Sequence, residues 1–260
     1  MHDQQASYRC CAIIPHYNHE NTLGKVVEYV CSLNIPVIVV DDGSPLTVRK
    51  VVSDICDQIV NDAPLSALNL IQHEENLGKG GAVVSGLRYA AQQGYTHAIQ
   101  VDADSQHDLN EIPKFLERSR VLPNALVLGK PYFDSSMPKI RYYGRYLTHF
   151  WVCINSLSRD VGDSMCGLRI YPVAQTLSII TASSGRIATH MGFDIEICVR
   201  SVWAGIQILN IPVRVFYPSE GISHFRPLLD NLEIVRMHIR CFFGMLTRAP
   251  RLIARVLRNH

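Results

Sequence analysis

The sequence lacks the patterns of disulfide-framework, zinc-finger and membrane-spanning proteins. Its eight cysteines form no CxxC pair and no zinc-finger spacing, which favours reduced, buried thiols. The longest uncharged stretch, 170–185, is interrupted by Pro172, so it falls short of the roughly 20 apolar residues that a spanning helix needs. The first residues show no basic start followed by an apolar run. We therefore expect no secretory signal, no spanning segment and a cytoplasmic location.

Charge is scarce in this chain and unevenly distributed. Charged residues make up 18% of the chain, and the formal net charge is only +2. Residues 226–260 nevertheless hold seven arginines against Asp230 and Glu233, so the remainder is mildly acidic. A basic carboxyl end predicts an anionic partner, either nucleic acid or the cytoplasmic face of a membrane. Nucleic acid is disfavoured because the chain shows no nucleic-acid-binding motif and its body is acidic.

Apolar residues, by contrast, are plentiful and follow a regular alternation. They make up 47% of the 260 residues, enough for one well-buried core. Runs rich in Val and Ile predict strands over 10–14, 36–40, 69–72, 98–101 and 125–128. Helical stripes lie between them, over about 23–33 and 82–90. Strands that alternate with helices predict an α/β fold with a mostly parallel sheet flanked by helices.

The pattern changes after about residue 130. A loop rich in proline and aromatic residues is predicted over 130–138, followed by a helix over about 145–158. Short strands are predicted over 168–171, 206–209 and 213–217. The chain has no internal repeat and no flexible linker, so we expect one domain over 1–226 and a basic helical tail over 227–260.

The tail shows two amphipathic patterns, one over 232–245 and one after Pro250, each with arginines among the apolar residues. Such helices lie in the interface of an anionic membrane. The same pattern also fits a helix that packs on the domain and exposes its arginines. Both interpretations stay open at the level of sequence.

Acidic residues follow two of the predicted strands, where open parallel sheets bind their ligands. Asp41 and Asp42 come directly after the second strand, a position equally typical of a turn or helix cap. Asp102, Asp104 and Gln106 alternate after the fourth strand. In an extended chain they would present three oxygen groups to one hard cation, Mg²⁺ or Mn²⁺, although a solvated loop is the alternative.

A glycine-rich segment precedes the second helical stripe. Residues 76–82 hold three glycines and Lys79, but they lack the P-loop pattern. Backbone amides at such a helix start can receive a phosphate, with the lysine as a point charge. Close packing of the helix against the sheet explains the glycines equally well.

Six motifs occur together in the order of a known family: Pro15-His-Tyr17-Asn18, Val39-Val-Asp41-Asp42-Gly43-Ser44, Asn76-x-Gly78-x-Gly80, Asp102-x-Asp104-x-Gln106-His107, Asp163-x-x-Cys-Gly167-Leu-Arg169 and Phe193-Asp194-Ile-Glu196. Over about residues 8–226 the sequence resembles glycosyltransferase family 2. Within that family it is most similar to the dolichyl- or polyprenyl-phosphate mannosyltransferase-like enzymes. The resemblance implies a GT-A fold and an inverting transfer of a hexose from a GDP- or UDP-linked donor.

The resemblance also implies roles for individual residues. Residues that would bind the nucleotide sugar are Pro15, Tyr17, Asp41, Asp42, Lys79 and Asp102. Those that would hold Mg²⁺ or Mn²⁺ are Asp102, Asp104 and Gln106. Residues with a catalytic role would be Asp194, Asp104 and Asp163. The acceptor or the diphosphate would be bound by Lys130, Arg141, Arg145 and His224, although Arg141 and Arg145 fit surface charges on a helix equally well. Lys130 and His224 depart from the family pattern, which has arginine and lysine at these positions.

The position of Asp194 bears on the acceptor. A hydroxyl acceptor needs a general base, whereas a phosphate acceptor is already anionic. Asp194 would be that base for an alcohol; alternatively it is a carboxylate favoured at a helix start.

The sequence thus predicts a metal-dependent glycosyltransferase at the cytoplasmic membrane face, peripheral on its inner side. Its acceptor would be a lipid, either polyprenyl phosphate or a lipid-linked hydroxyl. The alternatives are an inactive GT-A-like binding scaffold and a sugar-1-phosphate nucleotidyltransferase. For the latter, residues 10–21 lack the glycine-rich basic signature.

Overall fold

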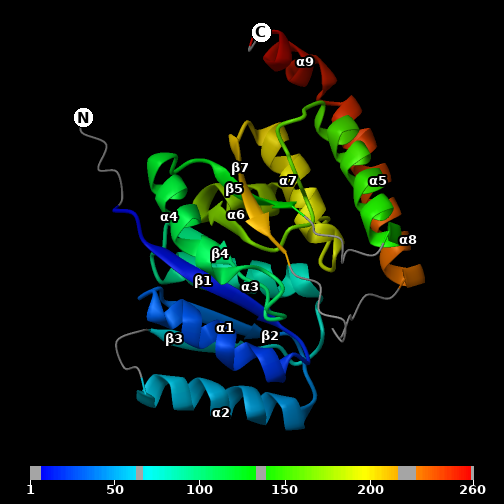
Figure 1. Ribbon diagram of the computed structural model, residues 1–260. Helices are drawn as coiled ribbons and strands as arrows, with labels where there is room; N and C mark the ends of the chain where they lie inside the picture. The colour runs from blue at the N-terminus through cyan, green and yellow to red at the C-terminus, as the bar shows by residue number, and fades with distance from the viewer. Residues whose placement is uncertain (1–6, 63–66, 133–138, 216–226, 259–260) are drawn as a thin grey trace.

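The framework of the protein is a seven-stranded sheet, seen in a computed structural model that describes residues 7–62, 67–132, 139–215 and 227–258 (Figure 1). Its strands are β1 (Cys10–His16), β2 (Val37–Asp41), β3 (Leu68–Gln72), β4 (His97–Gln100), β5 (Leu126–Tyr132), β6 (Arg169–Pro172) and β7 (Ile208–Arg214). The spatial order is β3-β2-β1-β4-β6-β5-β7. Only β6 runs antiparallel to its neighbours β4 and β5, so the predicted mostly parallel α/β sheet is confirmed.

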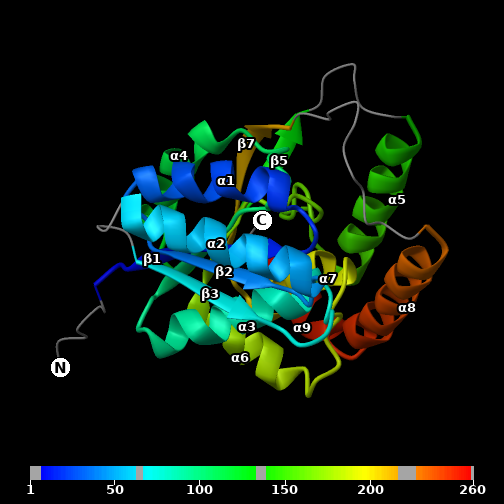
Figure 2. The same ribbon diagram turned by 90° about the horizontal axis from the view of Figure 1, so that it is seen from below.

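Helices cover both faces of the sheet. One face carries α1 (Glu20–Ser32), α2 (Leu46–Asp62) and α4 (Ile112–Val121), the last preceded by the short 3-10 helix η1 (Leu109–Glu111). The other carries α3 (Lys79–Gln92), α6 (Val173–Ala182) and α7 (Gly192–Ala204). Figure 2 shows the sheet between α1 and α4 on one side and α3 and α6 on the other. Two hydrophobic cores result, one on each face of the sheet.

Burial of β2 on both faces explains why its sequence is continuously apolar rather than alternating. All five residues of Val37–Asp41 are buried, as expected for a central parallel strand between two helix layers. The predicted stripe of α1 likewise faces the sheet through Leu23, Val26, Val27 and Val30. Strand β2 ends at Asp41, and the acidic residues gather at this end of the sheet.

Three local predictions were wrong. Residues 208–209 and 213–214, predicted to lie in two strands, belong to one strand, β7, and residues 216–217 lie outside the described residues. Pro212 is tolerated in β7 because this edge strand has only one neighbour. Lys130 and Pro131 lie in β5 instead of a loop, and α5 (Lys139–Ser156) begins earlier than predicted. All eight cysteines are free, but Cys10 and Cys153 are only partly buried.

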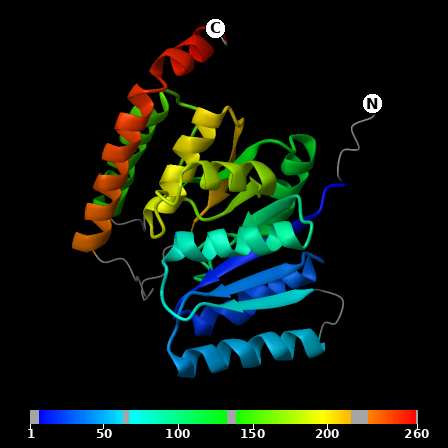
Figure 3. The same cartoon turned by 180° about the vertical axis from the view of Figure 1, so that it is seen from behind.

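The carboxyl end folds into α8 (Pro227–Leu246) and α9 (Ala249–Arg258). Helix α8 packs beside α5 and α7, and Ile234, Met237 and Cys241 join the core. Figure 3 shows α5 and α8 side by side along one flank of the molecule. None of the helices in the described part of the chain has the length and apolarity needed to cross a membrane.

The contact between α5 and α8 encloses a histidine. Asn155 Nδ2 donates to His238 Nδ1 at 3.1 Å, and the rings of Trp151 and His238 lie 6.4 Å apart. His238 is buried, and burial lowers its pKa to about 4. A histidine at this contact therefore remains neutral well below the pH at which it ionises in an unfolded chain.

Because the pKa of His238 is lower in the folded chain than in the unfolded chain, acid favours unfolding. Lowering the pH from 7 to 4 should cost the wild type about 3 kcal/mol of unfolding free energy through this residue. The variant His238→Asn keeps a polar group but cannot titrate. The same change of pH should therefore cost the variant about 3 kcal/mol less unfolding free energy than the wild type. Urea denaturation of both proteins at pH 7, 5.5 and 4 measures the difference, and parallel pH curves would contradict the assignment.

Candidate active site

The predicted site residues gather at one edge of the sheet. Because β1, β2 and β4 are parallel, their carboxyl ends meet there. Pro15 lies in the last part of β1 and Tyr17 just after it, Asp41 ends β2, and Asp102 follows β4 by two residues. The first residue of α3, Lys79, reaches the same place. The topology thus brings together residues that are far apart in the sequence.

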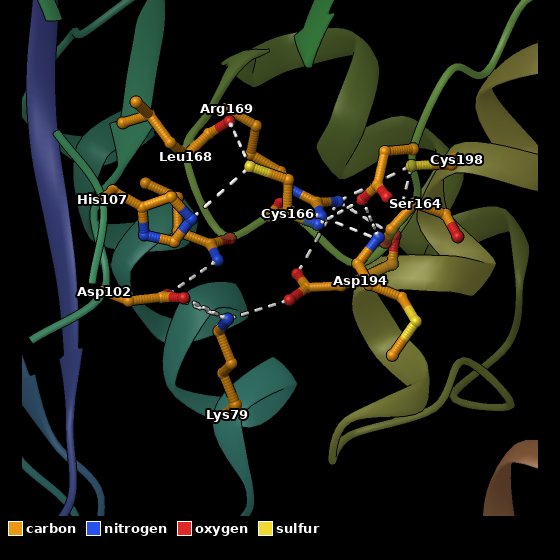
Figure 4. A network of polar contacts seen from close by, with 12 residues as sticks. Lys79, Asp102, His107, Ser164, Cys166, Leu168, Arg169, Asp194 and Cys198 are labelled. Atoms are coloured by element: carbon orange, nitrogen blue, oxygen red, sulfur yellow. Dashed lines mark hydrogen bonds and ion pairs between the residues drawn. The ribbon is translucent and has the colours of Figure 1, made fainter. Parts of the chain in front are cut away.

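The centre of this edge is an ammonium group between two carboxylates (Figure 4). Lys79 Nζ lies 2.8 and 2.9 Å from the two oxygens of Asp102 and 3.0 Å from Asp194 Oδ2. Burial alone would raise the pKa of Asp102, but Lys79 lowers it to about 2. Conversely, burial would lower the pKa of Lys79, and the two carboxylates raise it. Lys79 and Asp102 are therefore both ionised at neutral pH.

The segment after Asp102 turns, so the prediction of an extended chain with alternating oxygens was wrong. Ala103 and Asp104 form a turn, and Ser105 has a left-handed backbone with φ 57°. The backbone amide of Gln106 donates to Asp104 Oδ1 at 3.0 Å. The turn is held from outside by Thr22 Oγ1, which donates to the carbonyl of Ala103. Asp102 and Asp104 are thus brought together by a turn and not by strand geometry.

The charge at Asp104 is poorly compensated. Burial and the neighbouring Asp102 both raise its pKa above the ordinary value, and within the described residues Asp104 forms no ion pair. The same described residues contain no cluster of three or more His, Cys, Asp or Glu side chains that could hold a metal ion. A magnesium or manganese ion bound with phosphate oxygens needs only one or two carboxylates. The pair Asp102 and Asp104 fits that requirement.

Asp41 and Asp42 are both turned into the protein. Asp41 is fully buried, and its Oδ1 lies 2.8 Å from His16 Nδ1. His16 Nε2 accepts from the amide of His19, so Nδ1 carries the proton that is donated to Asp41. Asp42 Oδ1 lies 2.7 Å from His73 Nδ1 and accepts from the amide of Leu77. In this geometry both aspartates fix the loops around the site, and their contact with a nucleotide stays a prediction.

The glycine-rich start of α3 packs mainly on the segment that leads into α7, not on the sheet. A Cβ on Gly80 would lie 2.3 Å from Phe193 Cβ, and the amide of Gly81 donates to the carbonyl of Thr189. Farther along α3, Gly86 lies against Ile13 of β1. This close approach brings Lys79 near Asp194, at the beginning of α7.

Arg169 supports this arrangement from inside the protein, a role that the sequence analysis missed. Its side chain is fully buried on β6. It donates from Nη1 to the carbonyl of Asp194 at 2.9 Å and from Nε to the carbonyl of Cys166 at 3.0 Å, and Nη1 lies 3.7 Å from Asp194 Oδ1. An arginine within an otherwise apolar strand was the available signal, because a buried charge requires partners.

The loop before β6 closes over Asp102. A Cβ on Gly167 would lie 1.8 Å from Asp102 Oδ2, so only glycine allows the backbone to approach this carboxylate. The thiol of Cys166 lies 3.5 Å from His107 Nε2. Burial lowers the pKa of His107 although Asp102 and Asp104 oppose the shift. The loop therefore packs directly against Asp102 and His107.

Asp163 is engaged on both oxygens. Arg145 donates to Oδ2 through Nε and to Oδ1 through Nη2, the latter at 2.7 Å, and the amides of Met165 and Cys166 donate to Oδ1 at 2.8 Å. This geometry ties α5 to the loop before β6. A chemical role for Asp163, and an acceptor contact for Arg145, stay predictions.

Three predictions concern more peripheral positions. Lys130 is exposed at the end of β5, with its stem near Gly162. The side chain of Arg141 and the whole of His224 lie outside the described residues.

The sequence matches a family model and related proteins over most of its length. The family model of glycosyl transferase family 2 covers residues 11–173. An uncharacterized protein of Methanocaldococcus jannaschii is 29% identical over 240 residues, 89% of this chain and 98% of that protein. An undecaprenyl-phosphate mannosyltransferase of Micrococcus luteus is 26% identical over 79% of this chain and 82% of its own length.

Among solved structures, glucosyl-3-phosphoglycerate synthase of Mycobacterium tuberculosis with Mn²⁺ and uridine-diphosphate-glucose aligns with a TM-score of 0.58. The alignment covers 94% of this chain and 79% of that chain, at 16% identity. This likeness confirms the predicted GT-A fold.

The ion pairs of Lys79 predict a stability effect. Replacing Lys79 with methionine leaves Asp102 and Asp194 without their shared cation, which should lower the unfolding free energy by about 2 kcal/mol. That figure lies below the range for fully buried pairs because Lys79 is 21% exposed. The exposed pair of Lys114 with Glu111 provides the control, and Lys114→Met should change the unfolding free energy by under about 0.5 kcal/mol. Urea denaturation with a chelator present measures both, and equal losses would contradict the prediction.

Proposed function

Because the chain belongs to glycosyltransferase family 2, we propose that it transfers a hexose from a nucleoside diphosphate sugar to a polyprenyl-phosphate-type lipid acceptor. The observation that carries the proposal is the acidic pair Asp102 and Asp104 at the carboxyl ends of the parallel strands, beside Lys79. Ligands of open parallel sheets bind at this edge. The name of the Micrococcus luteus relative supports the acceptor class.

In the proposed reaction an oxygen of the acceptor phosphate attacks the anomeric carbon of the sugar. The bond from that carbon to the donor diphosphate breaks, and a nucleoside diphosphate leaves with the bonding electrons. Inversion follows because the attack and the departure occur on opposite faces of the sugar. Negative charge therefore grows on the departing diphosphate, and the site must stabilise it.

Asp102 and Asp104, with Gln106 nearby, are the residues that would hold a magnesium or manganese ion. Such an ion offsets the charge of the leaving diphosphate. Lys79 already neutralises Asp102 from the protein side, so the uncompensated charge of the pair lies mainly on Asp104. Pro15, Tyr17, Asp41 and Asp42 shape the adjoining ends of β1 and β2, where the nucleoside is proposed to bind.

Asp194 acts mainly by positioning in this proposal. A phosphate acceptor is anionic and needs no general base. Asp194 Oδ2 is already paired with Lys79 at 3.0 Å, and its backbone carbonyl is held by Arg169. The contact with Lys79 keeps the ammonium group over Asp102. An alcohol acceptor would instead require the other oxygen, Oδ1, which accepts no hydrogen bond within the described residues.

Residues 1–226 supply the catalytic machinery in this proposal, and the basic helices of residues 227–260 place it on the inner face of the cytoplasmic membrane. The basic character of the tail supports that placement, since anionic lipids attract arginine. The apolar tail of a polyprenyl acceptor lies in the bilayer, so a peripheral enzyme can meet its phosphate at the surface.

Replacing Asp104 with asparagine tests the donor site. Calorimetric titration with GDP-mannose and UDP-glucose should show binding of one donor that depends on Mn²⁺ in the wild type. Asp104→Asn should abolish that metal dependence and lower kcat/KM by about 100-fold or more, because a carboxylate is replaced by a neutral amide. The exposed Asp160 gives the control, and Asp160→Asn should bind donor as the wild type does. Absence of binding by either donor would support the inactive scaffold.

Replacing Asp194 with asparagine distinguishes the two acceptor classes. With a polyprenyl phosphate, Asp194→Asn should lower kcat by less than about tenfold, because no proton has to be removed from the acceptor. Loss of a general base would instead cost about 100- to 10,000-fold and would remove an acidic limb from the pH profile of kcat. Transfer assays over pH 5–9 measure both quantities. The larger loss with a changed pH profile would contradict the phosphate acceptor.

A further inference from the structure

The protein has a continuous exposed apolar face that belongs neither to the sheet nor to the catalytic edge. It consists of large apolar and aromatic side chains, each 52–68% exposed: Tyr143, Tyr146, Leu147 and Phe150 of α5, and Val235, Ile239 and Phe243 of α8. We call it the α5–α8 surface. Contiguous exposed patches of several large apolar side chains are uncommon on soluble proteins and mark interaction sites.

The exposed side chains of α5 form one stripe that points away from the rest of the protein. Trp151 and Asn155 face α8, where they contact His238, and Val152 is fully buried in the core. Tyr143, Leu147 and Phe150 are spaced by four and three residues, so they share the side of the helix that neither contact covers.

Helix α8 repeats this arrangement. His238 faces α5, while Met237 and Cys241 are buried in the core beside α7. Val235, Ile239 and Phe243 lie four residues apart and occupy the outer side. Because the two helices lie side by side (Figure 3), their outer stripes adjoin and form one surface.

We infer that the α5–α8 surface docks on an anionic lipid bilayer. The aromatic residues on α5 suit this partner, since tyrosine combines an apolar ring with a polar end and favours the membrane interface. Arg236, which is exposed beside Val235 on α8, supplies positive charge at its margin. Membrane docking requires no spanning helix, and an apolar face with basic residues beside it is how peripheral helices bind.

Charge distinguishes the bilayer from a second copy of this chain. In a symmetric dimer, each copy would present the same patch, so both copies would bring the same excess of positive charge to the interface. Anionic lipid offers the opposite charge. Helices α8 and α9 carry five arginines, against Glu233 and the buried Asp230.

A second group of charged side chains, centred on the buried Glu196, holds α8 in place against α7. Glu196 is fully buried and accepts from Arg200 on its own helix and from Arg240 on α8. Glu196 lies two residues after Asp194 on α7. The helix that meets the bilayer is therefore fixed to the helix that carries a site residue. This inference rests on the proposed function only in that a lipid acceptor gives the docking a use.

Flotation with vesicles tests the surface. The full chain should bind vesicles of phosphatidylcholine and phosphatidylglycerol, and bind phosphatidylcholine alone more weakly. The double variant Phe150→Ser with Phe243→Ser should weaken binding by about 100-fold, about tenfold for each phenylalanine. Arg236→Ser should weaken binding to the anionic vesicles alone, by about fivefold.

The matched control removes apolar side chains that are equally exposed elsewhere. Leu46 of α2 is 81% exposed and Val121 follows at 68% at the end of α4. Leu46→Ser with Val121→Ser should change vesicle binding by less than about twofold. Failure of the wild type to bind either vesicle, or equal losses in both double variants, would overturn the inference. So would a dimer in lipid-free ultracentrifugation that the Phe150 and Phe243 replacements abolish.

Activity separates this inference from the proposed function. With a short-chain polyprenyl phosphate in detergent, Phe150→Ser with Phe243→Ser should keep wild-type kcat, because neither residue lies at the catalytic edge. A wild type that binds anionic vesicles but transfers no sugar would refute the proposed function and leave the docking surface intact. Weak vesicle binding together with normal sugar transfer by the wild type would refute the docking surface and leave the proposed function intact.

Discussion

The ammonium group of Lys79 is the interaction on which the site depends. It joins the start of α3, the segment after β4 and the first turn of α7 by holding Asp102 and Asp194 at ion-pair distance. Two like charges could not lie so close inside the protein without a shared cation. Every other feature of the catalytic edge follows from bringing these three elements together. Gly80 lets α3 meet α7, and Gly167 lets the loop before β6 pass over Asp102.

Two arginines, Arg169 and Arg240, hold further elements to α7 in the same way, through polar contacts with buried groups. Arg169 fixes the backbone at Asp194 and the loop that contains Cys166. Two residues farther along α7, Glu196 binds Arg240 and thereby holds α8. Helix α7 thus connects the acidic edge of the sheet with the two helices that form the α5–α8 surface. The proposed transfer needs the acidic edge and the α5–α8 surface at a fixed distance from each other, since the proposed donor is soluble and the proposed lipid acceptor is not.

The motifs located the site but gave a wrong account of its local geometry. Asp102 and Asp104 were expected to align along an extended chain, yet a turn with Ser105 in a left-handed conformation brings them together. The contact of Asp41 and Asp42 with a nucleotide stays a prediction, and the structure adds the partners His16 and His73, which the motifs did not indicate. Residue spacing cannot reveal such partners, because the histidines approach from other strands and loops.

The sequence by itself determined the α/β class, the strands of the first half of the chain and the edge of the sheet at which the predicted site residues lie. These depend on local periodicity and on the rule that parallel strands end together. Only the tertiary structure decided that Lys79 neutralises Asp102 and Asp194, and that α5 adds its aromatic stripe to α8. Both depend on the three-dimensional distance between segments that are far apart in the chain, and charge pairing and apolar continuity exist only once those segments are packed.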